Sequence, residues 1–226
     1  MINSLFNQFD NIIVFDIETT GFDPKKDEII EVAALHVINK HSVPVIEDEF
    51  DALIGLTPGQ ILPASITNLT GITSEQLLQE GMSKSAACDK LTNKLGCSNP
   101  LLVAFNAQFD LCFLYYFLHN FGKAGELKNV KMLDALTVYK DRKPYPHKLS
   151  DAIQDYMLKP ENSHRALDDA RATFALLCAM DKESDDLEHY VNLFGYNPKY
   201  GVSGQKISSV KYLPQRYDSA LKLYEM

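Results

Sequence analysis

The sequence predicts an α/β layer architecture. Three observations support it: short β-branched apolar runs alternate with helical patterns, turn residues separate them, and 226 residues of which 46% are hydrophobic can build one substantial core. We expect one domain large enough to be an enzyme, with an additional segment.

The first half of the chain predicts two adjacent strands, a third strand and two helices. The run NIIVFDI is β-branched and apolar, and a turn with Gly21 and Pro24 separates it from EIIEVAALHVI, so these two strands are expected to be antiparallel. A short helix should end near Gly71. The strands are expected at residues 11–17, 28–38 and 45–54, and an amphipathic helix at 84–95.

The second half repeats a strand, sharp turn and helix. LLVAF follows the breaker Asn99-Pro100, and the apolar residues after it predict a well-buried helix that ends at Gly122. The strands expected here span 101–105 and 130–133, and the helices 109–121, 134–139, 148–158 and 165–180.

The character of the chain changes after Met180, so we predict a domain at residues 1–180 and a C-terminal extension at 181–226. The extension carries lysines and an arginine but no acid from 196 to 217. It is expected to pack on the domain or to contact nucleic acid or a partner.

Charge and cysteine content narrow the class of protein. A net charge of −8 argues against binding nucleic acid through a broad basic surface, but it is compatible with a nuclease that meets phosphates through bound metal ions. The four cysteines lack zinc-site spacing and are expected to be reduced. No leader and no membrane-length apolar run is seen, so we expect a cytoplasmic protein with no membrane partner.

Acidic residues stand at the ends of three apolar elements. Asp16 and Glu18 end the first strand, where a period of two places both carboxylates on one face. Asp110 begins a helix, and HRALDDA, with His164, Asp168 and Asp169, begins another. Each segment alone also fits a bland interpretation, because acids are favoured at helix starts and where a strand leaves the core.

Taken together, these acids would repel one another in a single cluster unless cations compensated their charge. Carboxylate oxygens with few histidines and no cysteine favour Mg²⁺ or Mn²⁺ over zinc.

The runs FDIETTGFDP, VAFNAQFD and HRALDDA, in this order, resemble the three motifs of the DEDDh family of 3′-5′ exonucleases. The similarity spans about residues 11 to 180 and is greatest to the epsilon-type proofreading subunits and domains of bacterial DNA polymerase III. It implies an RNase H-like fold with a mixed central sheet, whose first three strands are antiparallel, flanked by helices. It also implies that Asp169, five residues after His164, is the ligand and Asp168 a solvated neighbour.

The resemblance further implies a two-metal mechanism with two Mg²⁺ ions, for which Mn²⁺ can substitute. The expected ligands are Asp16, which bridges, Glu18, Asp110 and Asp169. His164 would take the proton from the attacking water, since imidazole has an ordinary pKa of about 6.5. The products would be nucleoside 5′-monophosphates.

The expected substrate is the 3′ end of DNA, single-stranded or frayed, in preference to RNA, in a proofreading or repair role beside a DNA polymerase subunit. The expected substrate-binding residues are Thr19, Thr20, Gly21, Ile72, Asn106 and Phe109. For Ile72 and Phe109 core packing is an equal alternative. Phe105-Asn106 departs from the His-Asn of many relatives.

Three other functions stay open. The chain could be an RNA-directed exonuclease, because no pocket for a 2′-hydroxyl can be read from the sequence. It could be a non-catalytic binding module, although all five positions hold the required residue types. It could also be a phosphatase or phosphodiesterase for small molecules.

Overall fold

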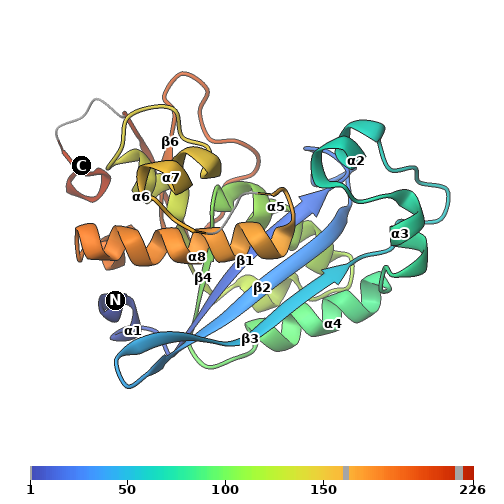
Figure 1. Cartoon of the computed structure of the whole chain (residues 1–226), viewed down its shortest axis with the longest axis horizontal. Coiled ribbons are helices and arrows are strands. Elements are labelled where there is room, and N and C mark those ends of the chain that lie inside the picture. Colours follow the sequence, from blue (N-terminus) through green and yellow to red (C-terminus); the bar gives the residue numbers. More distant parts are fainter. Residues whose placement is uncertain (1, 160–162, 217–220) are drawn as a thin grey trace.

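The computed structural model describes residues 2–159, 163–216 and 221–226. Its centre is a five-stranded mixed sheet in the order β3-β2-β1-β4-β5 (Figure 1). β1 and β3 pair antiparallel with β2, whereas β4 pairs parallel with β1, and β5 pairs parallel with β4. This confirms the predicted mixed sheet. The strands are β1 (Asn11–Thr19), β2 (Ile29–Lys40), β3 (Val43–Leu53), β4 (Pro100–Ala104) and β5 (Lys131–Asp134).

Helices cover both faces of the sheet because both faces of β1 are apolar. Ile13 and Phe15 share one core with α4 (Lys84–Leu95) and α5 (Ala107–His119). Ile12 and Val14 point to the other face and share a core with the long helix α8 (Ala166–Glu183), which crosses β1 and β2 in Figure 1. The smaller helices on this second side are α1 (Asn3–Phe6), α6 (Ala135–Lys140) and α7 (Leu149–Asp155).

The predicted helix that ends near Gly71 is followed by a second helix that the sequence analysis did not predict. α2 (Ala64–Thr70) ends where Gly71 takes a left-handed φ of 73°. Thr73 then starts α3 (Ser74–Gln79) with a capping box, in which it accepts from the N–H of Gln76 and donates its own N–H to that side chain.

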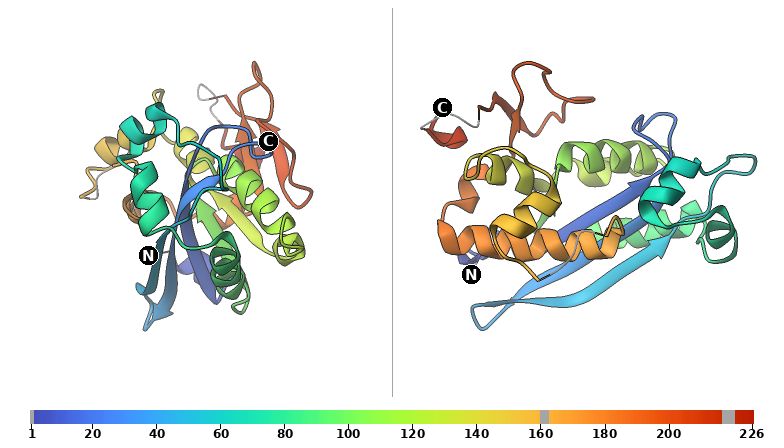
Figure 2. Two further views of the ribbon diagram at one scale, coloured as in Figure 1. Left: turned by 90° about the vertical axis from the view of Figure 1, so that its right-hand side faces the viewer. Right: turned by 45° about the horizontal axis from the view of Figure 1, so that its top comes forward.

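The C-terminal extension packs against the domain at the β5 end of the sheet (Figures 1 and 2). Its two strands, β6 (Leu193–Tyr196) and β7 (Lys211–Pro214), pair parallel, and Phe194 is buried in the same core as α5. α8 runs on to Glu183, so the predicted boundary after residue 180 falls within this helix. Within the described ranges, no helix is both long and apolar enough to cross a bilayer.

Candidate active site

The end of β1 presents Asp16 and Glu18 on the face that α8 covers. Ile12 and Val14 fill the core on this face, and the two-residue period continues through Asp16 to Glu18. Both side chains are partly buried. The strand therefore carries its two carboxylates out of an apolar layer and into a polar one.

Asp110 reaches the same place because β4 ends earlier than β1. The parallel pairing of β1 with β4 stops at Val14 and Val103, so no strand lies beside Asp16 on that edge. A turn at Asn106, with a left-handed φ of 67°, leads into α5. Asp110 lies in the first turn of α5 and is buried.

Asp134 stabilises this turn through hydrogen bonds. Its Oδ1 accepts from the backbone N–H groups of Asn106 at 2.9 Å and Ala107 at 3.0 Å, and its Oδ2 accepts from Thr137 Oγ1 at 2.7 Å. Asp134 also caps α6, accepting from the N–H of Leu136. One carboxylate thus fixes the starts of two helices, including the helix that carries Asp110.

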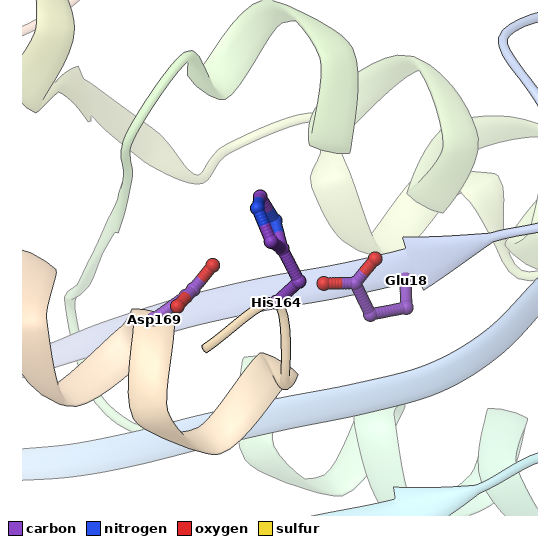
Figure 3. A group of neighbouring side chains, drawn as sticks. All are labelled: Glu18, His164 and Asp169. Atoms are coloured by element: carbon purple, nitrogen blue, oxygen red, sulfur yellow. The ribbon is translucent and has the colours of Figure 1, made fainter. Parts of the chain in front are cut away.

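The start of α8 contributes His164 and Asp169. One possible ligand atom from each of Glu18, His164 and Asp169 lies within 4.8 Å of the others, and Figure 3 shows the three side chains around one space. His164 is exposed and has a left-handed φ of 54°, whereas Asp169 is buried. Asp168 contacts Ser163 and Arg171 and lies outside this group.

The carboxylates act strongly on one another. Burial, followed by the charges of Asp110 and Asp169, raises the pKa of Asp16 well above its ordinary value. Burial and Asp169 raise the pKa of Glu18 to about 8, and Arg165 opposes that shift. Burial also raises the pKa of Asp110, against hydrogen bonds from backbone N–H groups. The charges of the four predicted acids therefore act on one another, and His164 lies within 4.8 Å of possible ligand atoms of Glu18 and Asp169.

This cluster fits a divalent cation. Buried carboxylates with raised pKa values hold repelling charges that a hard cation would neutralise. Three of the residues already offer ligand atoms close together. Carboxylate oxygens suit Mg²⁺ or Mn²⁺.

The raised pKa values predict a pH-dependent stability. A carboxyl group whose pKa is higher in the folded than in the unfolded protein binds protons more tightly when folded, so its contribution is full below the unfolded value and is lost as pH rises through the folded one. For Glu18 this window runs from 4.5 to about 8. The melting temperature of the metal-free protein should therefore fall across this range.

Mn²⁺ should raise that melting temperature, and more at about pH 8.5 than at about pH 6, because the ions bind deprotonated ligands. Thermal unfolding with EDTA or with Mn²⁺ at both pH values measures this. An equal Mn²⁺ effect at both would contradict the assignment of the cluster as a cation site.

Glu31 and Arg165 form an ion pair next to the cluster. Glu31 lies opposite Glu18 on β2 and is 1% exposed. Its Oε1 accepts from Arg165 Nε at 2.9 Å and Nη2 at 2.6 Å, and its Oε2 accepts from the N–H of Ala166 at 2.9 Å. The pair therefore ties the first residues of α8, next to His164, to the sheet.

Arg165→Ala should destabilise the fold by about 3 kcal/mol, because it leaves the charge of Glu31 buried without its partner. Arg171→Ala is a matched control: Arg171 also pairs with a single glutamate, Glu49, but that glutamate is partly exposed. Its loss should cost at most about 1 kcal/mol. Urea unfolding compares the two, and equal losses would contradict the role of burial.

Four of the predicted substrate residues lie at the end of β1, in the loop after it, or just before α5. Thr20 and Gly21 lie in the loop after β1, where Gly21 packs so closely on Asp27 that an added Cβ would lie 2.5 Å from its carboxylate. Asn106 is exposed beside the cluster. Thr19 is buried and donates to the carbonyl of Gly21 at 2.6 Å.

Ile72 and Phe109 differ from each other. Ile72 is 1% exposed and packs in the core under α2 and α3, the alternative left open above. The ring of Phe109 is partly buried and lies 6.4 Å, edge to face, from that of Phe22, which is 88% exposed. Whether any of these side chains contacts substrate stays a prediction.

Four residues at the site were missed in the sequence: Phe22, Glu31, Asp134 and Arg165. Glu31 did give a signal, since a single acid inside the apolar run EIIEVAAL must find a partner when buried. Asp134 ends a strand and Arg165 adjoins His164, but their partners are distant in sequence.

The fold and the cluster define a class, the RNase H-like enzymes with an acidic site at the end of the first strand. The chain belongs to the RNase T family of exonucleases. The model of this family, described as "Exonuclease", matches residues 13–177. The predicted family and fold are therefore confirmed.

Relatives include a PolC-type DNA polymerase III of Clostridium perfringens, 36% identical over 181 residues, and the 3′-5′ exonuclease DinG of Bacillus subtilis, 35% identical over 167 residues. These alignments cover 78% and 71% of this chain but only 12% and 16% of the relatives. Escherichia coli exonuclease I, solved with single-stranded DNA, superposes with a TM-score of 0.71 over 81% of this chain and 43% of its own, at 18% identity. That likeness shows the fold alone.

Proposed function

We propose that the chain is a metal-dependent 3′-5′ exonuclease that releases nucleoside 5′-monophosphates from single-stranded or frayed DNA ends. The observation that supports the proposal is the group of Glu18, His164 and Asp169, whose possible ligand atoms lie within 4.8 Å of one another, next to Asp16 and Asp110, whose charges interact. The family supplies the reaction class, and the name DNA polymerase III of the PolC-type relative favours DNA over RNA.

The four acids would hold two Mg²⁺ ions, whose charge would offset the repulsion that Asp110, Asp169 and Glu18 exert on Asp16. When bound, such a pair of ions activates the attacking water and stabilises the leaving 3′-oxygen. His164 is the general base: it is exposed to incoming water and lies beside Glu18 and Asp169.

The terminal nucleotide would lie where the loop after β1 meets the start of α5. Phe22 and Phe109 contact each other edge to face there, and Phe22 is largely exposed. An aromatic face accepts any base, so this pair suits an enzyme that removes nucleotides regardless of sequence. Gly21 keeps this loop in place, because the carboxylate of Asp27 fills the space that a side chain would need.

The test is a nuclease assay on matched DNA and RNA oligonucleotides, each labelled at the 5′ end so that shortening from the 3′ end gives a ladder. Single-stranded, duplex and mismatched substrates are compared with Mg²⁺, Mn²⁺ or EDTA. We expect a ladder with single-stranded and mismatched DNA, free 5′-mononucleotides, and no reaction in EDTA.

Other outcomes would replace the proposal with one of its rivals. Faster degradation of RNA would indicate an exoribonuclease, and hydrolysis of mononucleotide esters without oligonucleotide cleavage would indicate a phosphodiesterase. Binding without release of nucleotides in Mn²⁺ would indicate a binding module. A proofreading role requires a polymerase partner, and pull-down with a polymerase III catalytic subunit tests it.

A further inference from the structure

The C-terminal extension and α5 enclose a pocket apart from the acidic cluster. It has a volume of about 440 Å³ and lies between α5, the 3₁₀ turn η1 (Ala124–Leu127) and the loop of residues 205–209. This volume is in the range of about 300–1,000 Å³ that is usual for small-molecule sites. Leu111 and Cys112, which follow Asp110 on α5, line it, so the pocket adjoins the helix that serves the acidic cluster.

The loop that closes this pocket is tied to α5 by side-chain hydrogen bonds. Gln108 Nε2 donates to the carbonyl of Gln205 at 2.8 Å, and Tyr116 donates to Gln205 Oε1 at 2.8 Å. Tyr212 of β7 donates to Gln108 Oε1 at 2.6 Å and accepts from the N–H of Ile207 at 3.0 Å. Three of these hydrogen bonds join the extension to α5, and the fourth lies within the extension.

The chemistry of the pocket suits a nucleotide. Lys128 and Lys206 line it, together with Tyr115 and Tyr116. None of its lining residues, all of them within the described ranges, is Asp or Glu, although the chain carries a net charge of −8. Tyrosine faces stack on bases and lysines attract phosphate.

The loop after β1 contacts α5 both next to Asp110 and at a residue that lines the pocket. Lys25, in the loop after β1, lies 5.7 Å above the ring of Tyr116. The same loop carries Phe22, which meets Phe109 at the start of α5. A strand whose 3′ end lies at the cluster would pass these residues before it reaches the pocket.

We propose that this pocket binds an upstream nucleotide of the single-stranded substrate, so that the C-terminal extension lengthens the substrate track. The inference rests on the proposed nuclease function. It commits to nucleic acid because an acid-free, lysine-lined wall with two tyrosines is complementary to bases and phosphates.

The test measures binding apart from hydrolysis. Fluorescein-labelled oligothymidylates of increasing length, with phosphorothioate linkages at the 3′ end, are titrated in Ca²⁺ and followed by anisotropy. Wild-type affinity should rise with length until the pocket is reached. Lys128→Glu/Lys206→Glu should weaken binding of the long oligonucleotides by about tenfold or more and leave a trinucleotide within about twofold.

Tyr115→Ala should show the same dependence on length, with a smaller loss of roughly fivefold. Lys40→Glu/Lys199→Glu is the matched control: it changes the same charge at two exposed lysines outside the pocket and should alter long and short substrates alike. Melting temperatures verify that each variant folds.

Equal weakening by the pocket and control variants, or equal weakening of long and short oligonucleotides, would overturn the inference. So would binding of free dTMP in the pocket without any effect of length. Failure of the nuclease proposal is distinguishable from failure of this inference. A wild-type protein that binds with the expected length dependence but releases no nucleotide in Mn²⁺ would contradict the nuclease activity and still support the binding of an upstream nucleotide in the pocket.

Discussion

Asp16→Asn should reduce exonuclease turnover by roughly 10³-fold or more, the largest effect expected of any single substitution. Asp16 lies at the centre of the cluster, where Asp110, Asp169 and Glu18 all act on it. A catalytic metal contributes several kcal/mol of charge stabilisation, and each 1.36 kcal/mol is tenfold in rate. Steady-state release of mononucleotides from single-stranded DNA measures the loss.

The same substitution should raise the melting temperature of the metal-free protein above pH 7, because it removes one of the repelling charges. Lower activity with higher metal-free stability is the signature of a cation site. Asp168→Asn is the control: this neighbouring acid is about half exposed and lies outside the cluster, so turnover should change by less than about twofold. Equal effects of the two substitutions would refute the site.

His164→Ala should lower turnover by roughly 10²–10⁴-fold and leave KM nearly unchanged. The imidazole lies beside Glu18 and Asp169 and is exposed, so its removal would take away the proposed proton acceptor but no buried packing. A change in kcat without a change in KM places the effect in the reaction step.

His41→Ala provides a close control. His41 is also exposed and also has a left-handed φ, 52° against 54° for His164, but it lies in the turn between β2 and β3. Any effect of backbone strain should be similar in the two variants. If both retained wild-type turnover, His164 would not be the base.

Much of the fold could be predicted because its elements are strongly apolar and clearly punctuated. β1 begins at the predicted residue, and α4 has the predicted bounds. β1 continues two residues beyond its apolar run, to Thr19, because β2 still pairs with Glu18 and Thr19 there. α7 ends three residues before its predicted end, at Asp155. The short helices α1 and α3 are too brief to show a periodic pattern.

The acidic residues of the site could be selected from the sequence because each ends or begins an apolar element. The residues that hold these acids in place could not be selected from the sequence. Glu31 finds Arg165 134 positions away, and Asp134 holds the backbone at Asn106 from 28 positions away. Such contacts depend on how the strands register and where β4 stops, which a local pattern does not contain.

The carboxylate of Asp134 joins the acidic cluster to the far end of the chain. Thr137, which donates to Asp134, also accepts from the N–H of Gly195 at 3.0 Å, and its carbonyl accepts from Gln215 Nε2 at 2.8 Å. Truncating the extension would therefore expose the polar groups that steady the helix carrying Asp110. If the proposed function holds, shortened versions of the chain should lose activity through a loosened α5 as well as through loss of the proposed substrate contacts, and side-chain substitutions would separate the two effects.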